Sequence, residues 1–510
     1  MADTVISKHV SCILIPEMIL EDLLRATTVL AWQGGSNLPV ASLAYDSRRV
    51  QPGGLFFAIP GEHADGNRFV GNALAQGAAG VVSERPMPAG FEGAWVRVES
   101  TRRALAELSR AFYGNPDSRL ALVGITGTNG KTTTAYLVRS ILEAAGTSTG
   151  LLGTIEYRLG DRIIAAHHTT PESLDLAAYF DELLRSGGKA AVMEVSSHAL
   201  AQERVWGFRF RAGVFTNLTG DHLDYHKDME SYFAAKRRLF EGLGTPPPEL
   251  CVVNLDDGWG KRLLDVPSPR QVTFGVESNA QVKPKHFTFG PEGIQATLAT
   301  VRGKLEIESA LLGRPNLENI LAAVAVTEGL GASEESIQQG IAALRKVPGR
   351  FERIDEGQPF TVIVDYAHTQ DALRNALRTV RELTRNRLIT VFGCGGDRDR
   401  MKRPAMGETA GSLSDAVVLT SDNPRSEDPI LIMNDVMVGL QKANRPYLAE
   451  VDREKAIRKA LEQAHEGDLV LIAGKGHETY QVLRDRTIAF DDREAARLAL
   501  REMGFGQGSK

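Results

Sequence analysis

The sequence is poor in cysteine, and this scarcity limits the kinds of protein it can encode. Three cysteines occur in 510 residues, Cys12, Cys251 and Cys394, and they lie far apart. An odd and scattered set does not make a framework of disulfide bonds, and it is typical of a reducing compartment. We therefore expect a cytoplasmic protein rather than a disulfide-stabilised secreted one.

The sequence also lacks long apolar runs. No run reaches the roughly 18 residues of a membrane span, although hydrophobic residues make up 43% of the chain. The N-terminal segment MADTVISKHVSCILIPEMIL has no basic start and no small-residue cleavage site, and Pro16 and Glu17 interrupt its apolar patch. We therefore expect neither a membrane span nor a signal peptide.

Excess charge of one sign is missing as well. The formal net charge is −5, so no general attraction to nucleic acid or to an anionic membrane is expected. Internal repeats and low-complexity tracts are also absent from the sequence. The simplest expectation is a monomer without a nucleic-acid partner.

Length and turn-rich segments predict three domains. At roughly 150 residues per domain, 510 residues correspond to about three. GNPDSR at 114–119 and VPGRFE at 347–352 interrupt the regular patterns, as Gly and Pro clusters do between domains. We therefore predict domains at 1–117, 118–346 and 347–510.

Patterns of apolar residues predict an α/β fold. Short apolar runs such as LALVGIT (120–126) alternate with helical patterns through the central segment, which favours a mostly parallel sheet covered by helices. Residues 294–311 alternate apolar and polar positions, like antiparallel strands. The runs FTVIVDYA, LITVFGC, DAVVLTS and DLVLIAG predict a smaller doubly wound, Rossmann-like unit at the C-terminal end.

One segment predicts a phosphate site. GITGTNGKTTT (124–134) joins an apolar strand to a helix through a glycine-rich turn, where backbone N–H groups and the helix dipole favour an anion. Lys131 is placed to reach the β- and γ-phosphates of ATP or GTP, and Thr132 to hold Mg²⁺. The spacing departs from the P-loop pattern, because five residues rather than four separate Gly124 and Gly130. The alternative is a glycine-rich turn without a ligand.

Six ordered motifs identify a family resemblance. TGTNGKTTT, HHTTPESL, MEVSSHAL, NLTGDHLDYH, VPGR and DYAHT occur in this order along the chain, and together they resemble the Mur ligase family. The resemblance implies an N-terminal UDP-sugar-binding domain, a central P-loop-like ATPase and a C-terminal Rossmann-like domain that receives an amino acid. It also implies ATP-dependent amide ligation through an acyl phosphate, in the synthesis of peptidoglycan precursors.

The resemblance also implies residue roles around ATP and Mg²⁺. It gives Arg350 a γ-phosphate contact that forms when the domains close, and makes Lys131, Lys236, His222 and Arg350 catalytic. The implied ATP contacts are Gly127, Thr128, Asn129, Gly130, Lys131, Thr132, Thr133, Asn319, Asp365 and His368, with Asn316 beside Asn319. The implied ligands of two Mg²⁺ ions are Thr132, Glu194, His222 and Lys236, with Lys236 carbamylated.

Some of these positions have plainer interpretations. Periodicity alone predicts that Lys236 lies on the surface of a helix, in YFAAKRRLF. Without the resemblance, Glu194 is a solvated carboxylate at a strand end, and Arg350 is a surface arginine. Two positions depart from the family pattern, because Gln370 stands where proline is usual after DYAHT and Pro315 stands where an aromatic residue is common.

The N-terminal segments DSR (46–48) and GEHADGNRF (61–69) resemble the ligases that add the third amino acid. That resemblance implies UDP-N-acetylmuramoyl-L-alanyl-D-glutamate as a substrate. Arg204 is the one cation in the implied set, so it is the expected anchor for an anionic group. The implied contacts are Ser47, His63, Asp65, Thr169, Thr170, Ser196, Gln202 and Arg204.

The stretch SDNPRSEDP (421–429) predicts the second substrate. Pro424 stiffens the turn, and we expect Asp422, Glu427 and Asp428 to crowd the Arg425 guanidinium. In the family, DNPR marks enzymes that take meso-2,6-diaminopimelate, whose far carboxylate suits a bidentate Arg contact. The site implied by the resemblance consists of Arg398, Asp422, Asn423, Pro424, Arg425, Gly474 and Glu478.

Other functions stay open on the sequence alone. The same fold can add L-lysine or another diamino acid, although Arg425 would repel a bare ammonium. A nucleotide-driven switch without ligation chemistry is a second alternative, and DNPR can also be a local turn with an Arg–Glu pair. A folate-tailing ligase is disfavoured by the N-terminal segments that resemble a uridine-nucleotide site.

Overall fold

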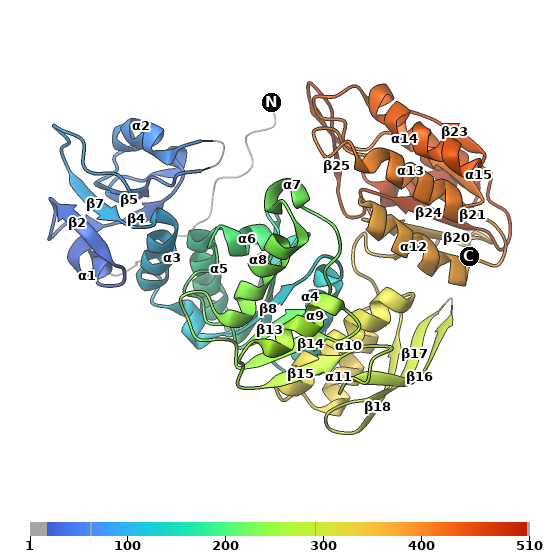
Figure 1. Cartoon of the computed structure of the whole chain (residues 1–510), viewed down its shortest axis with the longest axis horizontal. Helices are drawn as coiled ribbons and strands as arrows, with labels where there is room; N and C mark the ends of the chain where they lie inside the picture. Colours follow the sequence, from blue (N-terminus) through green and yellow to red (C-terminus); the bar gives the residue numbers. More distant parts are fainter. Residues whose placement is uncertain (1–17, 62–63, 291, 507–510) are drawn as a thin grey trace.

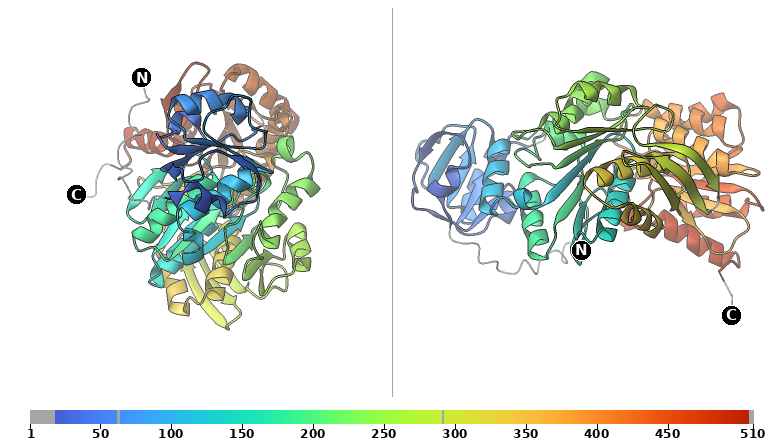
Figure 2. Two further views of the ribbon diagram at one scale, coloured as in Figure 1. Left: turned by 90° about the vertical axis from the view of Figure 1, so that its left-hand side faces the viewer. Right: turned by 90° about the horizontal axis from the view of Figure 1, so that it is seen from below.

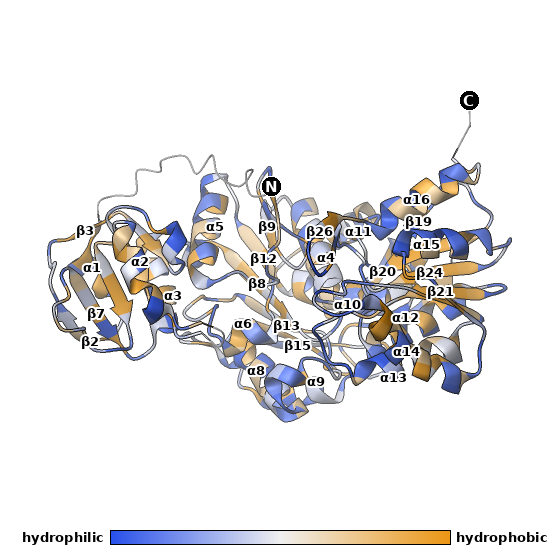
Figure 3. Cartoon of the chain, turned by 90° about the horizontal axis from the view of Figure 1, so that it is seen from above, coloured by the Kyte–Doolittle hydropathy of each residue, from blue (hydrophilic) through white to orange (hydrophobic). Residues whose placement is uncertain are grey.

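The computed structural model describes residues 18–61, 64–290 and 292–506, and these form three α/β parts (Figure 1). The N-terminal and C-terminal parts lie at opposite ends of the central part (Figure 2). In each part, apolar strands lie inside and polar helix faces lie outside (Figure 3). The predicted fold class, three α/β units in series, is confirmed.

The N-terminal part is built on a five-stranded sheet of order β2-β7-β6-β5-β4, parallel except for the β2–β7 pair. Its predicted amphipathic helix is confirmed as α3 (Thr101–Phe112), with Ser100 capping the first turn. The other elements are β1 (Met18–Ile19), α1 (Leu20–Leu24), β2 (Val29–Gln33), β3 (Pro39–Val40), β4 (Ser42–Ala44), η1 (Ser47–Arg49), β5 (Gly54–Phe57), η2 (Gly66–Phe69), α2 (Val70–Ala75), β6 (Gly80–Ser83) and β7 (Ala94–Val98).

The central part contains an eight-stranded sheet of order β11-β10-β9-β12-β8-β13-β14-β15. Strands β9 and β12 to β15 run parallel to β8, and a β10–β11 hairpin closes one edge. Its strands are β8 (Ala121–Thr126), β9 (Thr149–Leu152), β10 (Glu156–Leu159), β11 (Arg162–Ala165), β12 (Ala190–Glu194), β13 (Ala212–Phe215), β14 (Leu250–Asn254) and β15 (Gln271–Phe274).

Helices cover both faces of this sheet, which explains why its strands read as continuous apolar runs. In β8, Val123 and Ile125 enter the core under α4, α10 and α11, whereas Leu122 enters the opposite core under α5, α6 and α8. The helices are η3 (Pro116–Arg119), α4 (Lys131–Ala144), α5 (Ser173–Arg185), α6 (Ser197–Ala201), α7 (Leu223–His226), α8 (Met229–Glu241), α9 (Gly258–Arg262), η4 (Leu263–Asp265), α10 (Arg314–Gly329) and α11 (Glu334–Ala343).

The predicted antiparallel segment is confirmed as a three-stranded sheet. Strands β16 (Lys283–Gly290), β17 (Gly293–Ala299) and β18 (Lys304–Ser309) pair in that order. Ile294, Ala296 and Leu298 of β17 point into the core, and the residues between them face outward, as period-two alternation requires.

The C-terminal part is the predicted doubly wound unit, with strand order β19-β20-β24-β21-β22-β23. Its main strands are parallel, and α12, α13 and α14 cover one face while α15 and α16 cover the other. Its elements are β19 (Glu352–Ile354), β20 (Thr361–Asp365), α12 (Gln370–Leu383), β21 (Leu388–Phe392), α13 (Lys402–Leu413), β22 (Ala416–Leu419), α14 (Pro429–Ala443), β23 (Tyr447–Ala449), α15 (Arg453–Glu462), β24 (Leu469–Ala473), β25 (Tyr480–Val482), β26 (Thr487–Ala489) and α16 (Asp492–Glu502).

This topology gathers loops at two sheet edges. The loops after β8, β12 and β13 leave the carboxyl end of the central sheet, and those after β20, β21, β22 and β24 leave the corresponding end of the C-terminal sheet. Open α/β sheets bind ligands at such edges. Across 18–61, 64–290 and 292–506, the helices are too short or too polar to cross a membrane.

Candidate active site

The glycine-rich turn connects β8 to α4, as predicted. Gly127 has φ +147° and Gly130 has φ +86°, values that side-chain-bearing residues rarely adopt. A Cβ at Gly127 would lie 1.9 Å from Thr216 Oγ1, and one at Gly130 would lie 2.3 Å from Asn319 Oδ1. Gly124 instead lies within β8, against the ring of Phe210. The turn is thus framed by Gly127 and Gly130, which explains the unusual spacing from Gly124.

Neighbouring backbone holds this turn in place. Thr128 N donates to Asn217 O at 2.8 Å, and Asn129 N donates to Asn217 Oδ1 at 2.9 Å. Behind the turn, Asn319 accepts from Thr134 Oγ1 at 3.3 Å and donates to Asn316. These contacts fix the conformation of the loop, and the N-terminus of α4 is directed at it.

Two lysines meet above the turn. Lys131 Nζ donates to Gly127 O at 3.0 Å and to Thr128 O at 2.9 Å, and Lys236 Nζ donates to the same Gly127 O at 2.7 Å. Burial lowers the pKa of both amines, that of Lys236 well below its ordinary value. The surface position that periodicity predicts for Lys236 is wrong, because α8 turns this residue inward, where it is 1% exposed.

Glu194 ends β12 beside the turn and is buried, so its interpretation as a solvated carboxylate is wrong. Its Oε2 accepts from Thr132 Oγ1 at 3.0 Å and from Thr154 Oγ1 at 3.0 Å, and Thr154 N donates to Oε1 at 2.8 Å. Thr154 Oγ1 also lies 3.1 Å from Thr169 Oγ1. A chain of polar contacts therefore runs from the nucleotide loop to the predicted UDP-peptide contacts.

Those predicted contacts form a second group beside Glu194. Thr170 Oγ1 donates to Glu194 O at 2.9 Å and accepts from Ser196 N at 3.0 Å. Arg204 donates to Thr170 O at 2.9 Å and to Gln202 Oε1 at 2.8 Å. Its guanidinium also pairs with a carboxylate, Glu172, at 3.0 Å, so the charge of this expected anchor is partly compensated within the protein.

The N-terminal contacts lie on a separate part of the molecule. Ser47 is buried in η1, and the flanking Tyr45 OH donates to Asp175 of α5 at 2.6 Å, which joins this segment to the central part. Asp65 caps η2 by accepting from Asn67, and it also pairs with Arg85. The predicted contact His63 lies outside the described residues.

His222 follows β13 in a left-handed conformation with φ +54°. It lies beside Asp221, with Nε2 at 3.4 Å from Oδ2, and its ring is 4.8 Å from that of His198. Burial lowers the pKa of His222 to about 4, although Asp221 opposes the shift. A neutral imidazole is the form that binds metals, but the structure groups His222 with Asp221 and His198, whereas Thr132 contacts Glu194.

Arg350 reaches the nucleotide loop from the C-terminal part. Its Nη2 donates to Thr132 Oγ1 at 3.4 Å, and its guanidinium lies 4.4 Å from the centroid of the Tyr366 ring. The preceding Gly349 has φ +62°, and a Cβ there would lie 2.0 Å from His477 N. The turn that carries Arg350 is therefore packed tightly against the loop that follows β24. The interpretation of Arg350 as a surface arginine is wrong.

The other predicted nucleotide contacts on the C-terminal part follow β20. Asp365 is buried and accepts from Phe351 N and Ala367 N, both at 3.0 Å. Burial raises its pKa. Burial lowers the pKa of His368, and Asp221 of the central part opposes that shift. Asp365 thus anchors the turn after Arg350, and His368 faces the central part.

The turn SDNPRSEDP follows β22, and its contacts differ from the predicted ones. Arg425 has φ +53° and donates from Nη1 to Gly396 O at 2.7 Å. Glu427 pairs with Arg403 at 2.7 Å, and Asp428 caps α14 by accepting from Ile430 N at 2.8 Å. The expected crowding of Arg425 by Glu427 and Asp428 is therefore wrong, and so is the local Arg–Glu pair. The left-handed backbone turns Arg425 toward the loop after β21.

Asn423 and Glu478 come together across the loops after β22 and β24. Asn423 Nδ2 donates to Glu478 Oε2 at 2.8 Å, and Asn423 Oδ1 accepts from Val482 N at 2.9 Å. Asp422 is buried beside Gly474, whose φ is +119°, and a Cβ there would lie 2.8 Å from Asp422 Oδ2. The remaining predicted members are Pro424, which is buried, and Arg398, which is exposed on the loop after β21.

Sequence reasoning missed several residues of these groups. Lys475 is fully buried between Asn423 and Glu478, and Thr154 joins Glu194 to Thr169. Asn217 holds the nucleotide turn, and Tyr366 lies under Arg350. Of these, Lys475 had a visible signal, because a lysine between two glycines after a buried strand sits where ligands bind.

His477 supports a prediction about pH. Its ring lies 4.9 Å from that of Tyr366, and burial lowers its pKa to about 3. The unfolded chain takes up this proton near pH 6.5 and the folded chain only near pH 3. The free energy of unfolding should therefore fall as pH drops through this window, by at most about 1.4 kcal/mol per pH unit from this group.

We expect His477→Gln to flatten that dependence, as measured by urea unfolding at a series of pH values between 6.5 and 4.5. His286→Gln, at an exposed position on β16, is the control. A His477→Gln slope equal to that of the unchanged protein would contradict the assignment.

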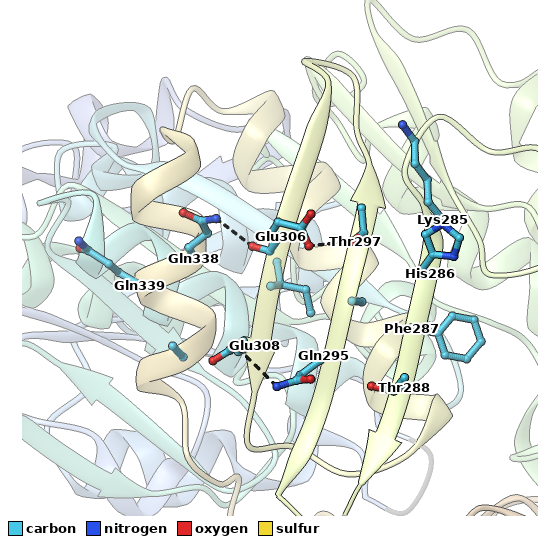
Figure 4. A pocket seen from close by; sticks show the side chains of 13 residues that line it. Lys285, His286, Phe287, Thr288, Gln295, Thr297, Glu306, Glu308, Gln338 and Gln339 are labelled. Carbon is cyan, nitrogen blue, oxygen red and sulfur yellow. Dashed lines mark hydrogen bonds between the residues drawn. The ribbon is translucent and has the colours of Figure 1, made fainter.

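A cavity of about 960 Å³ lies away from all these groups, on the outer face of the β16–β18 sheet beside α11 (Figure 4). Gln338 Nε2 donates to Glu306 O at 2.9 Å, and Thr297 donates to the Glu306 carboxylate at 2.7 Å. The lining of this cavity contains none of the predicted site residues. We therefore place the chemistry at the two sheet edges, where charged and polar side chains converge.

Comparison with family models gives three consecutive matches. Residues 39–113 match a model described as Mur ligase family, catalytic domain. Residues 125–327 match the Mur ligase middle domain, and residues 349–476 match the Mur ligase, glutamate ligase domain. The order of the three matches follows the order of the three α/β parts.

Similar proteins extend over nearly the whole chain. UDP-N-acetylmuramoyl-L-alanyl-D-glutamate--2,6-diaminopimelate ligase of Solibacter usitatus is 55% identical over 92% of this chain and 95% of its own length. A solved structure with the same ligase name is 32% identical, covers 96% of this chain and 99% of that chain, and has a TM-score of 0.69. MurF ligase from Thermotoga maritima in complex with ADP is 20% identical, covers 90% of this chain and 97% of that chain, and has a TM-score of 0.62, which shows a shared fold.

Proposed function

The chain belongs to the Mur ligase family, and from this premise we propose that it joins meso-2,6-diaminopimelate to UDP-N-acetylmuramoyl-L-alanyl-D-glutamate at the expense of ATP. The ligase of Solibacter usitatus bears the name of this reaction. The product would be a precursor of peptidoglycan.

One observation carries the choice of the amine. Within the described residues, Arg425 has no carboxylate at ion-pair distance, because Glu427 is bound by Arg403 and Asp428 caps a helix. The charge of Arg425 helps to lower the pKa of Asp397, but a half-buried guanidinium without a carboxylate at ion-pair distance is suited to a carboxylate from a ligand. The far carboxylate of meso-diaminopimelate supplies that anion, and L-lysine does not.

The ligation needs two steps whose charges the central site is suited to balance. The substrate's D-glutamyl carboxylate takes the γ-phosphoryl group of ATP, which gives an acyl phosphate and ADP. The amine of the amino acid then attacks the acyl carbon, and phosphate leaves with the bonding electrons while the amine loses a proton. Lys131 and Arg350 both lie at the nucleotide loop, where cations reduce the repulsion between the two anionic oxygens.

The residues at Glu194 fit a Mg²⁺ site. Glu194 is buried and receives hydrogen bonds from neutral donors, and no described lysine or arginine lies at ion-pair distance from it. Mg²⁺ usually binds one or two carboxylates together with substrate phosphates and water. We infer that Glu194 and Thr132 hold it, with His222 as a third protein ligand. The ion would neutralise the phosphate oxygens.

No group of three or more His, Cys, Asp or Glu side chains able to hold a metal occurs in the described part of the chain. This fits an ion whose remaining ligands come from the nucleotide.

We further infer that Lys236 is carbamylated. Its amine is buried beside a second lysine, and its pKa is lowered because burial disfavours the charged form. A neutral amine can bond to the carbon of CO₂ and lose a proton, which replaces one of two adjacent amines by a carboxylate. That carboxylate would provide a ligand for a second Mg²⁺ ion.

The carbamate predicts a dependence on CO₂. Enzyme freed of bicarbonate should lose ligase activity and regain it when bicarbonate is returned, and ¹³C-bicarbonate should give a protein carbamate signal in the NMR spectrum. Lys236→Arg should show neither effect, whereas Lys261→Arg, at an exposed position on α9, should keep both. A signal that persists in Lys236→Arg would place the carbamate elsewhere.

The three parts of the chain are suited to three different substrates. We propose that residues 1–117 bind the uridine nucleotide through Ser47, His63 and Asp65, that residues 118–346 bind ATP, and that residues 347–510 bind the amino acid. The dipeptide end would lie near Thr169, Thr170, Ser196, Gln202 and Arg204. We also propose that the protein acts as a monomer in the cytoplasm, where its nucleotide substrates are made.

A single assay tests the proposed function. Purified protein, ATP, Mg²⁺ and the UDP-muramoyl dipeptide are incubated with meso-diaminopimelate, L-lysine, L-ornithine or no amine, and product masses are measured. We expect the tripeptide mass and ADP release with meso-diaminopimelate. A preference for L-lysine would reject the proposed amine, and ADP release that is independent of both substrates would favour a nucleotide switch.

A further inference from the structure

We propose that Lys475 is a positioning residue that sets the selectivity for the amino acid. This proposal rests on the proposed function and adds a residue to its amino-acid site. Lys475 follows β24 and is 0% exposed. Its Nζ donates to Glu478 Oε2 at 2.8 Å and to Asn423 Oδ1 at 3.2 Å. A buried ammonium is retained where it has such partners, because an unpaired charge is costly.

The two carboxylate oxygens of Glu478 have unequal numbers of hydrogen bonds. Lys475 Nζ and Asn423 Nδ2 both donate to Oε2, each at 2.8 Å. Within the described residues, Glu478 Oε1 receives no hydrogen bond. Lys475 and Asn423 therefore hold one carboxylate oxygen and leave the other as the acceptor for an incoming ammonium. A site with its acceptor already oriented loses less entropy on binding.

Lys475 also changes which ammonium groups suit this acceptor. Its positive charge partly compensates Glu478, so a bare side-chain ammonium gains less from Glu478 than it would from a free carboxylate. The far end of meso-diaminopimelate carries a carboxylate as well as an ammonium, and Arg425 lies across the same group of loops to take it. Lys475 and Arg425 together thus favour a zwitterionic end over a cationic one.

The chain offers a matched control. Lys459 on α15 pairs with Glu450, and its side chain is 42% exposed. Replacing either lysine with methionine removes one charge and one ion pair, but only Lys475 contacts the amino-acid site. Lys475→Arg keeps the positive charge and the hydrogen-bond donors, and tests whether these are enough to maintain the selectivity for the amino acid.

The experiment measures kcat and KM for meso-diaminopimelate and for L-lysine, with ATP and the UDP-muramoyl dipeptide saturating. In Lys475→Met we expect KM for meso-diaminopimelate to rise roughly 30-fold, as when a hydrogen-bonded charge is lost, while kcat changes less than about threefold. We expect the ratio of the two kcat/KM values to shift toward L-lysine by roughly tenfold. Lys475→Arg should recover part of the selectivity, and Lys459→Met should behave as the unchanged protein.

These measurements distinguish a role of Lys475 in positioning Glu478 from a role in stabilising the fold alone. Equal losses of kcat/KM for both amines would overturn the proposal, because a loss of folded protein lowers both values alike and leaves their ratio unchanged. An unchanged KM with a lower kcat would overturn it as well. If Lys475→Met does not yield folded protein, Lys475→Gln is measured in the same way, with the same shift expected. Failure of the unchanged protein to make the tripeptide would reject the proposed function instead.

Discussion

Replacing Arg425 with alanine should lower kcat/KM for meso-diaminopimelate by roughly 10²- to 10³-fold, because the far carboxylate loses its charge-assisted partner. The value for L-lysine should not fall and should rise slightly, since the substitution removes the charge that repels its side-chain ammonium. The two enzymes are compared by initial rates of ADP release with each amine. The preference for meso-diaminopimelate is therefore expected to shrink or vanish.

Arg378→Ala provides the control for this prediction. Arg378 is exposed on α12 and also carries one positive charge on the C-terminal part. It should keep the full preference. An Arg425→Ala enzyme that still prefers meso-diaminopimelate would show that the carboxylate binds elsewhere, and the ATP-consuming ligation would remain as proposed.

Replacing Lys131 with methionine should lower kcat for ligation by roughly 10³-fold. The amine lies over the nucleotide turn, within 3.0 Å of Gly127 O, and a fixed cation at transferring phosphate typically contributes an effect of this size. Methionine keeps the length of the side chain and removes the charge. Phosphate release in single-turnover experiments with all three substrates measures the effect.

The corresponding control is Lys261→Met on α9, where the lysine is exposed. It should retain the full rate. A Lys131→Met enzyme within tenfold of the unchanged protein would mean that Arg350 and the bound Mg²⁺ neutralise the phosphates without Lys131.

Sequence reasoning located the elements that hold the site. The strand, glycines and Lys-Thr run of 120–134 carry their own local signals, and β8 and α4 lie where predicted. The apolar runs of the C-terminal part likewise predicted β20, β21, β22 and β24. Patterns of this kind depend on neighbours in sequence, so one chain is enough to read them.

Positions that depend on distant contacts were harder to predict. Lys236 looks like a solvent-facing lysine because helical periodicity reports only its own helix, whereas its burial results from Gly127 and Tyr232 packing over it. Glu427 looks like the partner of Arg425 because it is close in sequence, yet Arg403 from α13 binds it. Lys475 has no periodic signal at all, since its partners come from two loops.

The close packing of Gly349 against Gly476 and His477 has a mechanical consequence. The turn that carries Arg350, the proposed phosphate contact, therefore packs directly against the loop that carries Glu478, part of the proposed amino-acid site, and leaves no room for a methyl group between them. Any rotation of the C-terminal part as a unit would therefore move this turn and this loop together. In the proposed reaction, the approach of Arg350 to the phosphates and the closing of the amino-acid loop over the amine would thus occur together, so that ATP would not be cleaved before the amine is bound.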